Sequence, residues 1–159
     1  MSKLIELTYV SEPVQGMSFL GLMRLLYHSY LRNLRLEITG ALIFENNQFG
    51  QVIEGPEDVI DALWEKIQKD DRHKNIRLVE RKSISARNFE KWTMVFQGDK
   101  ELFKGLPEVS AAIEEVNFPV DHPLLAALKG EGKKLLKWVV FKGRHLHAMR
   151  HSVKCINIL

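Results

Sequence analysis

Hydrophobic and polar positions along the chain follow two different periods. Alternation with a period of two predicts strands, because successive strand side chains point to opposite faces. The segments with this pattern, or with a short apolar run between turn residues, are 4–10, 38–44, 48–53, 76–83 and 91–97. Glu45, Asn46 and Asn47 separate the second and third of these, and such an Asn-rich turn predicts a β-hairpin.

Two segments have apolar residues at helical spacing instead. The first helix is predicted from an N-cap at Ser18 to about Asn33, and the second from Pro56, at the first helical position, to about Lys69. Their apolar stripes contain Leu22, Leu25 and Leu26 in the first helix, and Val59, Ile60, Leu63 and Ile67 in the second. Asn33 continues the first stripe, so its amide either caps the helix end or binds a ligand.

The resulting order, β-α-β-β-α-β-β, predicts an α+β fold of the ferredoxin-like type. We expect a five-stranded mixed sheet with both helices on one face, formed by residues 1–98. Residues 99–142 are expected to form a mainly helical extension. It includes a helix over 108–116, a segment at 124–128, and either a helix or an added strand over 133–141. Residues 143–159 are basic and His-rich, and we expect a flexible tail.

Composition agrees with this picture and excludes some classes. The 159 residues, with 45% hydrophobic and 27% charged, are ordinary for one soluble domain plus an extension. We expect no membrane span and no signal peptide. The one cysteine, Cys155, cannot form an internal disulfide, which fits a reducing cytoplasm.

Motifs for catalysis, metal binding and nucleic-acid binding are weak. Paired carboxylates, a nucleophile elbow and a phosphate-binding glycine loop are not evident, so we do not expect an enzyme. His147, His151 and Cys155 would share one face of a helical tail, but a solvated segment is the expected state and we assign no metal. The net charge of +3 is mild. The C-terminal part of the chain has a basic stretch with interleaved aromatic residues. Such a stretch either binds nucleic acid or, more commonly, is a solvated basic tail. It contains Lys133, Lys134, Lys137, Trp138, Phe141, Lys142, Arg144 and Arg150.

Three polar side chains fall on faces that should be buried. Tyr9 and Gln51 lie among apolar residues on predicted strands, and Asn33 lies on the apolar stripe of a helix. A buried amide needs hydrogen-bond partners, which either neighbouring backbone or a ligand supplies. A ferredoxin-like fold brings the three elements together. The second interpretation predicts a planar, polar-edged ligand between the two helices, with apolar walls from Leu25, Leu26, Leu63 and Ile67.

Four segments, in order over roughly the first hundred residues, resemble one known family. They are LTYVS (7–11), RNLRLEITGALIFENNQFGQVIEG (32–55), IQKDDRH (67–73) and RNFEKWTM (87–94). The chain resembles the BLUF domains, blue-light sensors that hold a flavin non-covalently. The flavin is usually FAD, and FMN or riboflavin remains possible here.

The resemblance implies roles for particular residues. Tyr9 matches the photoactive tyrosine, from which the excited flavin takes an electron and then a proton. Gln51 matches the glutamine that rearranges and shifts the absorption to the red. Asn33 matches the residue that bonds the polar edge of the flavin. Positions around the flavin are matched by Ser11, Leu25, Arg32, Ile67, Arg72 and His73, of which His73 is alternatively a turn residue. Trp92 and Met94 match a signalling pair and are alternatively plain core.

The resemblance also implies output through protein contacts. We expect a homo-oligomer that signals through the last strand and the extension after Gly98 to a separate, unidentified effector protein. Two alternatives stay open. The first is a light-independent flavin- or ligand-binding module. The second is a regulator that binds nucleic acid through its basic tail.

Overall fold

A computed structural model describes residues 2–16, 18–89, 95–97, 113–114, 121–128 and 138–140. Four long strands and two long helices make up most of it: β1 (Leu4–Pro13), α1 (Phe19–Arg35), β2 (Thr39–Glu45), β3 (Gln48–Pro56), α2 (Glu57–Gln68) and β4 (His73–Ser83). Four short elements follow, namely β5 (Val95–Gln97), β6 (Ile113–Glu114), α4 (Pro123–Ala127) and β7 (Trp138–Val140).

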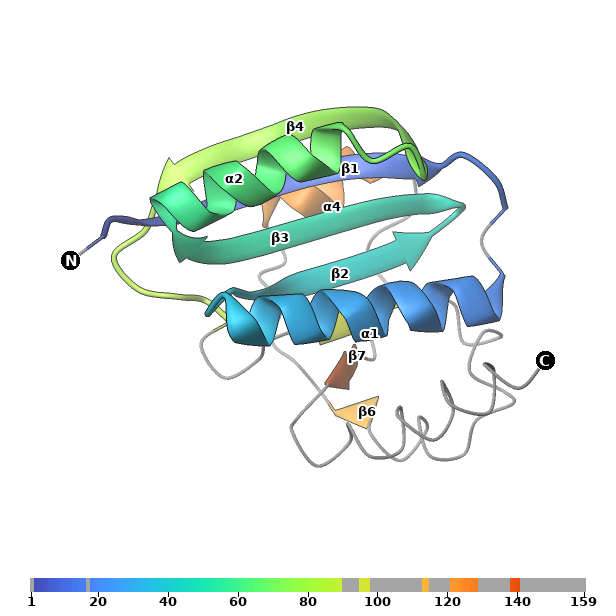
Figure 1. Cartoon of the computed structure of the whole chain (residues 1–159), viewed down its shortest axis with the longest axis horizontal. Coiled ribbons are helices and arrows are strands. Elements are labelled where there is room, and N and C mark those ends of the chain that lie inside the picture. The colour runs from blue at the N-terminus through green and yellow to red at the C-terminus, as the bar shows by residue number, and fades with distance from the viewer. Residues whose placement is uncertain are drawn as a thin grey trace.

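All the described strands join one mixed sheet in the order β4-β1-β3-β2-β5-β7-β6. β2 and β5 run parallel, and the other neighbouring strands run antiparallel. Figure 1 shows α1 and α2 in front of the sheet and α4 behind it. We call the side under α1 and α2 the front face and the side under α4 the reverse face.

Local chemistry explains where α1 begins and ends. The Ser18 hydroxyl accepts a hydrogen bond from the backbone N–H of Gly21 at 3.1 Å, which confirms the predicted N-cap. Arg32 and Arg35 lie in the last turn, where cations favour the helix C-terminus. The helix ends at Arg35, with Leu36 as its C-cap, rather than at Asn33. Asn33 therefore lies inside the last turn, fully buried, and is not the C-cap.

The β2–β3 hairpin is tighter than predicted. Glu45 belongs to β2 and pairs with Gln48, so the turn is only Asn46-Asn47. Both asparagines have positive φ, 51° and 58°, as a two-residue type I′ turn requires. Asn adopts this left-handed conformation more readily than most residues, so the local sequence fixes the hairpin register.

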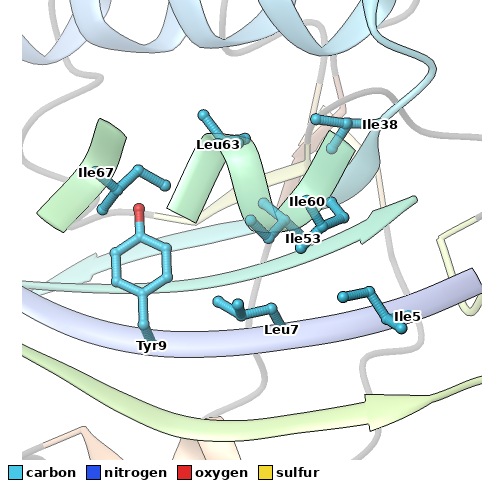
Figure 2. Packing of buried hydrophobic residues seen from close by; sticks show 8 residues of the cluster. All are labelled: Ile5, Leu7, Tyr9, Ile38, Ile53, Ile60, Leu63 and Ile67. Carbon is cyan, nitrogen blue, oxygen red and sulfur yellow. The ribbon is translucent and has the colours of Figure 1, made fainter. Parts of the chain in front are cut away.

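The two faces of the sheet bury different cores. On the front face, Ile5, Leu7 and Tyr9 of β1 point toward α2 and meet Ile60 and its neighbours (Figure 2). On the reverse face, Val10, Ile43 and Val52 pack with Phe89 and with two leucines of the C-terminal segment. Strand alternation produces this division, because Tyr9 and Val10 are adjacent on β1 yet belong to opposite cores.

The α+β class is confirmed, with both long helices on one face. The described sheet has four long strands and three short ones rather than five strands. Pro56 is the N-cap of α2 rather than its first helical residue. The helix predicted over 108–116 is wrong at Ile113 and Glu114, which pair with β7 as a strand. Tertiary pairing outweighs local helical spacing at these two residues.

Several predictions lie outside the described residues. They include the signalling pair Trp92 and Met94, the tail at 143–159 with its possible metal ligands, and most of the basic stretch. In the extension, the described residues contain both strand (β6, β7) and helix (α4). Within the part of the chain that the structure describes, the helices are too short or too polar to cross a bilayer.

Candidate functional site

Tyr9 and Gln51 form a buried pair on the front face of the sheet. Their Cα atoms are direct cross-strand partners in the β1–β3 register. The Tyr9 hydroxyl donates a hydrogen bond to Oε1 of Gln51, and only 4% and 5% of the two residues is exposed. Burial raises the pKa of the Tyr9 phenol well above its ordinary value. The phenol is therefore a protonated donor at neutral pH.

A pocket opens beside this pair, between α1 and the end of α2. Its floor comes from the strands and its walls from the two helices and the turn that leads into β4. The lining residues are Tyr9, Leu25, His28, Ser29, Arg32, Leu42, Phe49, Gln51, Ile67, Asp70, Arg72 and His73. Oε1 of Gln51 is taken by Tyr9, so the amide nitrogen is the end of this side chain left to bind a ligand.

Arg32 links the pocket to Asn33. Nε and Nη2 of Arg32 donate to Oδ1 of Asn33 at 3.4 and 3.2 Å. Arg32 lines the pocket, whereas Asn33 is fully buried behind it. This part of α1 thus presents a guanidinium, backed by an amide, to the same space as the Tyr9–Gln51 pair.

Charged and polar groups form the rim near the start of β4. Nε and Nη2 of Arg72 donate to the carboxylate of Asp70 at 2.9 and 2.6 Å, and this contact lowers the pKa of Asp70 to about 2. The Ser11 hydroxyl lies 3.1 Å from Nδ1 of His73. Burial lowers the pKa of His73, so the neutral imidazole is favoured at this edge.

A second hollow adjoins the pocket at the beginning of α1. It shares Leu25, His28 and Arg72 with the pocket and adds Arg24. The second hollow is thus lined by two guanidinium groups, of which that of Arg72 is paired with Asp70. Such groups bind phosphate oxygens well.

The structure brings most of the predicted site residues together. Tyr9, Leu25, Arg32, Gln51, Ile67, Arg72 and His73 line the pocket. Ser11 and Asn33 contact it through His73 and Arg32. Leu26 and Leu63, predicted as walls, are buried in the structure and do not line the pocket.

Sequence reasoning missed five lining residues: His28, Ser29, Leu42, Phe49 and Asp70. Alternation on β3 places Phe49 on the face of Gln51, and helical spacing places Ser29 one turn from Leu25. Those two signals were available. Leu42 becomes a neighbour of Gln51 only through the β2–β3 register, which the turn length determines.

The pocket fits a flavin by the chemistry of its groups. An isoalloxazine ring has two apolar faces and one edge of carbonyls and ring nitrogens. Leu25 and Ile67 offer apolar contact from the two helices, and the Gln51 amide and the Arg32 guanidinium offer donors. Among the described residues, no three His, Cys, Asp or Glu side chains are grouped so as to hold a metal ion.

Comparisons with known proteins agree with this chemistry. Residues 4–95 match the family model BLUF, described as sensors of blue light using FAD. The photoactivated adenylate cyclase subunit beta of Euglena longa is 32% identical over 116 residues, which cover 72% of this chain and 13% of that protein. The chain therefore spans only a small part of the length of this relative.

Solved structures show the same fold. The dark-state structure of BlrB, a BLUF protein, is 35% identical, with a TM-score of 0.59 over 70% of this chain and 84% of that one. Klebsiella pneumoniae BlrP1, solved with FMN and cyclic diGMP, is 34% identical, with a TM-score of 0.53 over 57% of this chain and 24% of that one.

Proposed function

Since the chain belongs to the BLUF family of flavin-binding blue-light sensors, we propose that the pocket between α1 and α2 is its flavin site and that Tyr9 and Gln51 are the photoactive pair. The observation that carries this proposal is the buried hydrogen bond from Tyr9 to Gln51 at the floor of the pocket. It supports the proposal because a phenol and its hydrogen-bond acceptor lie together at the pocket that the ring of the flavin would fill.

A bound flavin supplies absorption of blue light and, when excited, an oxidant for a nearby phenol. Tyr9 would then give up an electron and, through its hydrogen bond to Oε1 of Gln51, a proton, both of which the excited flavin would take up. With a flavin bound, the amide of Gln51 would rearrange while Tyr9 is oxidised, and the hydrogen bond that it offers to the polar edge of the ring would change. Return of the electron and proton to Tyr9 leaves a different set of hydrogen bonds and a red-shifted absorption. No covalent bond is left, so the change reverses in the dark.

The remaining pocket residues would hold the flavin. Arg32, backed by Asn33, binds the polar edge of the ring, and Leu25 and Ile67 cover its faces. The Ser11 hydroxyl contacts Nδ1 of His73 and so holds the imidazole at the rim of the pocket. We propose FAD as the bound flavin, with its phosphates in the adjoining hollow near Arg24 and Arg72. BlrP1 was solved with FMN, so FMN and riboflavin are the comparison ligands in binding assays.

We further propose that residues 1–98 are the sensor, that 99–142 carry output and oligomer contacts, and that 143–159 are a basic tail. Trp92 and Met94 would relay the change along the last strand. The output is a contact with an effector protein in the cytoplasm, without chemistry by this chain.

The proposed function is tested by Tyr9→Phe, which removes one hydroxyl and keeps the ring. We expect the variant to bind FAD and to lose the light-induced red shift. Tyr27→Phe is the matched control, because Tyr27 lies on α1 outside the pocket lining, and it should shift like the wild type. A normal red shift in flavin-loaded Tyr9→Phe would overturn the assignment.

A further inference from the structure

A second aromatic side chain contacts Tyr9 and yet lies outside the pocket. The rings of Tyr9 and Trp64 are 5.2 Å apart between their centroids and tilted by 51°. Trp64 is on α2, three residues before Ile67, and packs against the front-face core. It does not line the pocket, whereas Tyr9 does. Tyr9 therefore touches both the pocket and the indole ring.

The indole of Trp64 is less enclosed than the phenol that it contacts. Trp64 is only partly buried, whereas Tyr9 is 4% exposed. Among the described residues, the indole N–H has no hydrogen-bond partner, and this group is not fully shielded from solvent. Water can therefore accept a proton from it. The contact between the two rings thus connects a buried phenol to a side chain at the surface.

Indole and phenol are both readily oxidised by loss of one electron, but they differ in what happens to the proton. A phenol that has lost an electron becomes strongly acidic and passes its proton to its acceptor, which for Tyr9 is Gln51. An indole that has lost an electron keeps its N–H proton longer and then releases it to water. Electron transfer falls steeply with distance, so two rings in contact exchange an electron rapidly.

We propose that Trp64 is a second electron donor in the light reaction, which reduces oxidised Tyr9 before the phenol proton moves. The inference rests on the proposed function of Tyr9 and Gln51. One electron passes from Trp64 to Tyr9, whose O–H bond stays intact, and the indole N–H proton goes to water. The electron that Tyr9 lost stays on the flavin. Oxidised Tyr9 thus has two competing fates: proton transfer toward Gln51, which leads to the red shift, and reduction by Trp64, which does not.

The neutral indole radical left on Trp64 reacts with a solute. A thiol gives it a hydrogen atom and becomes a thiyl radical, so Trp64 is restored and electrons from the thiol collect on the flavin. Without a thiol, dissolved oxygen adds to the indole ring, and a second oxygen molecule takes the electron from the flavin. The first reaction bleaches the blue absorption, and the second leaves a lasting chemical mark on Trp64.

The test is peptide mass spectrometry of the flavin-loaded protein after blue light in air without thiol, with the red shift recorded on the same samples. We expect oxygen adducts on Trp64 after illumination, and none in the dark or in the flavin-free protein under the same light. Trp138 is the internal control. It lies on β7, which is separated from β1 by β3, β2 and β5, and it should stay unmodified.

Trp64→Phe keeps an aromatic ring beside Tyr9 and removes the oxidisable indole. We expect a higher yield of the red shift per absorbed photon, and loss of the bleaching that a thiol causes under continuous light. Trp138→Phe makes the same change far from Tyr9 and should behave like the wild type.

Two variants of the photoactive pair separate an electron donor from a residue that only packs against Tyr9. Gln51→Leu removes the proton acceptor and so prolongs the oxidised state of Tyr9. We expect more oxygen adduct on Trp64 than in the wild type, although the red shift is lost. Tyr9→Phe keeps the ring contact but cannot pass on the oxidation, so the adduct should disappear.

The outcomes separate this inference from the proposed function. A normal red shift without adducts on Trp64, or with equal yields in Trp64→Phe and the wild type, would overturn the inference and leave the proposed function standing. Adducts that persist undiminished in Tyr9→Phe would show that diffusing oxygen species oxidise the indole, and would overturn it as well. Absence of a red shift in the wild type would overturn the proposed function, and this inference with it.

Discussion

The same two strands carry a buried polar pair on each face of the sheet, and the two pairs differ in charge. On the front face, Tyr9 of β1 lies opposite Gln51 of β3. On the reverse face, Glu6 of β1 lies opposite Glu54 of β3. All four residues are at most 5% exposed. The front pair is neutral and faces a pocket, whereas the reverse pair consists of carboxyl groups held by several donors.

The carboxylate of Glu54 shows how firmly the reverse pair is held. It accepts hydrogen bonds from the backbone N–H groups of Asn88 and Phe89 at 2.8 and 3.0 Å, and from the Thr39 hydroxyl at 3.0 Å. Burial raises the pKa of Glu54, and a buried carboxyl group that lost these donors would be costly. A neutral amide exchanges one hydrogen bond for another at little cost. The difference supports the proposal that the front pair switches while the reverse pair stays fixed behind it.

The largest expected effect is that of Glu54→Leu. The buried N–H of Phe89 and the half-buried donors of Asn88 and Thr39 lose their acceptor. An unpaired buried donor costs roughly 1–3 kcal/mol and a half-buried one less, so we expect a loss of about 2 kcal/mol or more in the free energy of unfolding. Denaturant unfolding measures this loss. Glu54→Gln is the control, because its amide oxygen still accepts, and it should lose clearly less. Equal stability of Glu54→Leu and the wild type would contradict the account of the reverse pair as a fixed frame.

Gln51→Leu is expected to cost much less stability and yet abolish the switch. It leaves one donor, the Tyr9 hydroxyl, without its acceptor, at a cost of about 1 kcal/mol. The red shift should nevertheless be lost while flavin is retained. Absorption spectra and unfolding curves of the same preparation test both parts. A normal red shift in this variant would show that Gln51 is not the switching group.

The smallest expected effect concerns the pH dependence of stability. Burial alone would raise the pKa of Glu6, but the contacts with His122 and Lys82 outweigh it and lower the pKa below its ordinary value of 4.5. The stabilisation from this group is therefore complete above pH 4.5 and is lost as the pH falls through the lower folded pKa. As the pH falls below 5, the Glu6→Gln variant should therefore lose less stability than the wild type. Thermal unfolding at several acidic pH values measures the slope, and parallel curves would contradict the assigned role.

The sequence predicts the front face well because its signals are local. Alternation places Tyr9 and Gln51 inward, Ser18 caps α1, and helical spacing carries Asn33 to the buried stripe. The sequence does not predict the buried polar cluster on the reverse face. Glu6 and Glu54 stand in strands whose ends are ordinarily solvated, and their partner Asn88 comes from a distant turn. His122 is 116 residues from Glu6, so only the folded chain brings these two together.

The most direct test of the contrast between the two faces is a light-minus-dark infrared difference spectrum of the flavin-loaded protein. Gln51→Leu and Glu54→Gln serve to assign the side-chain bands. We predict bands of the Gln51 amide and of a flavin carbonyl, with the carboxylate bands of Glu6 and Glu54 unchanged. Carboxylate bands that change in the light, in the absence of an amide band from Gln51, would place the switch on the reverse face and contradict the account.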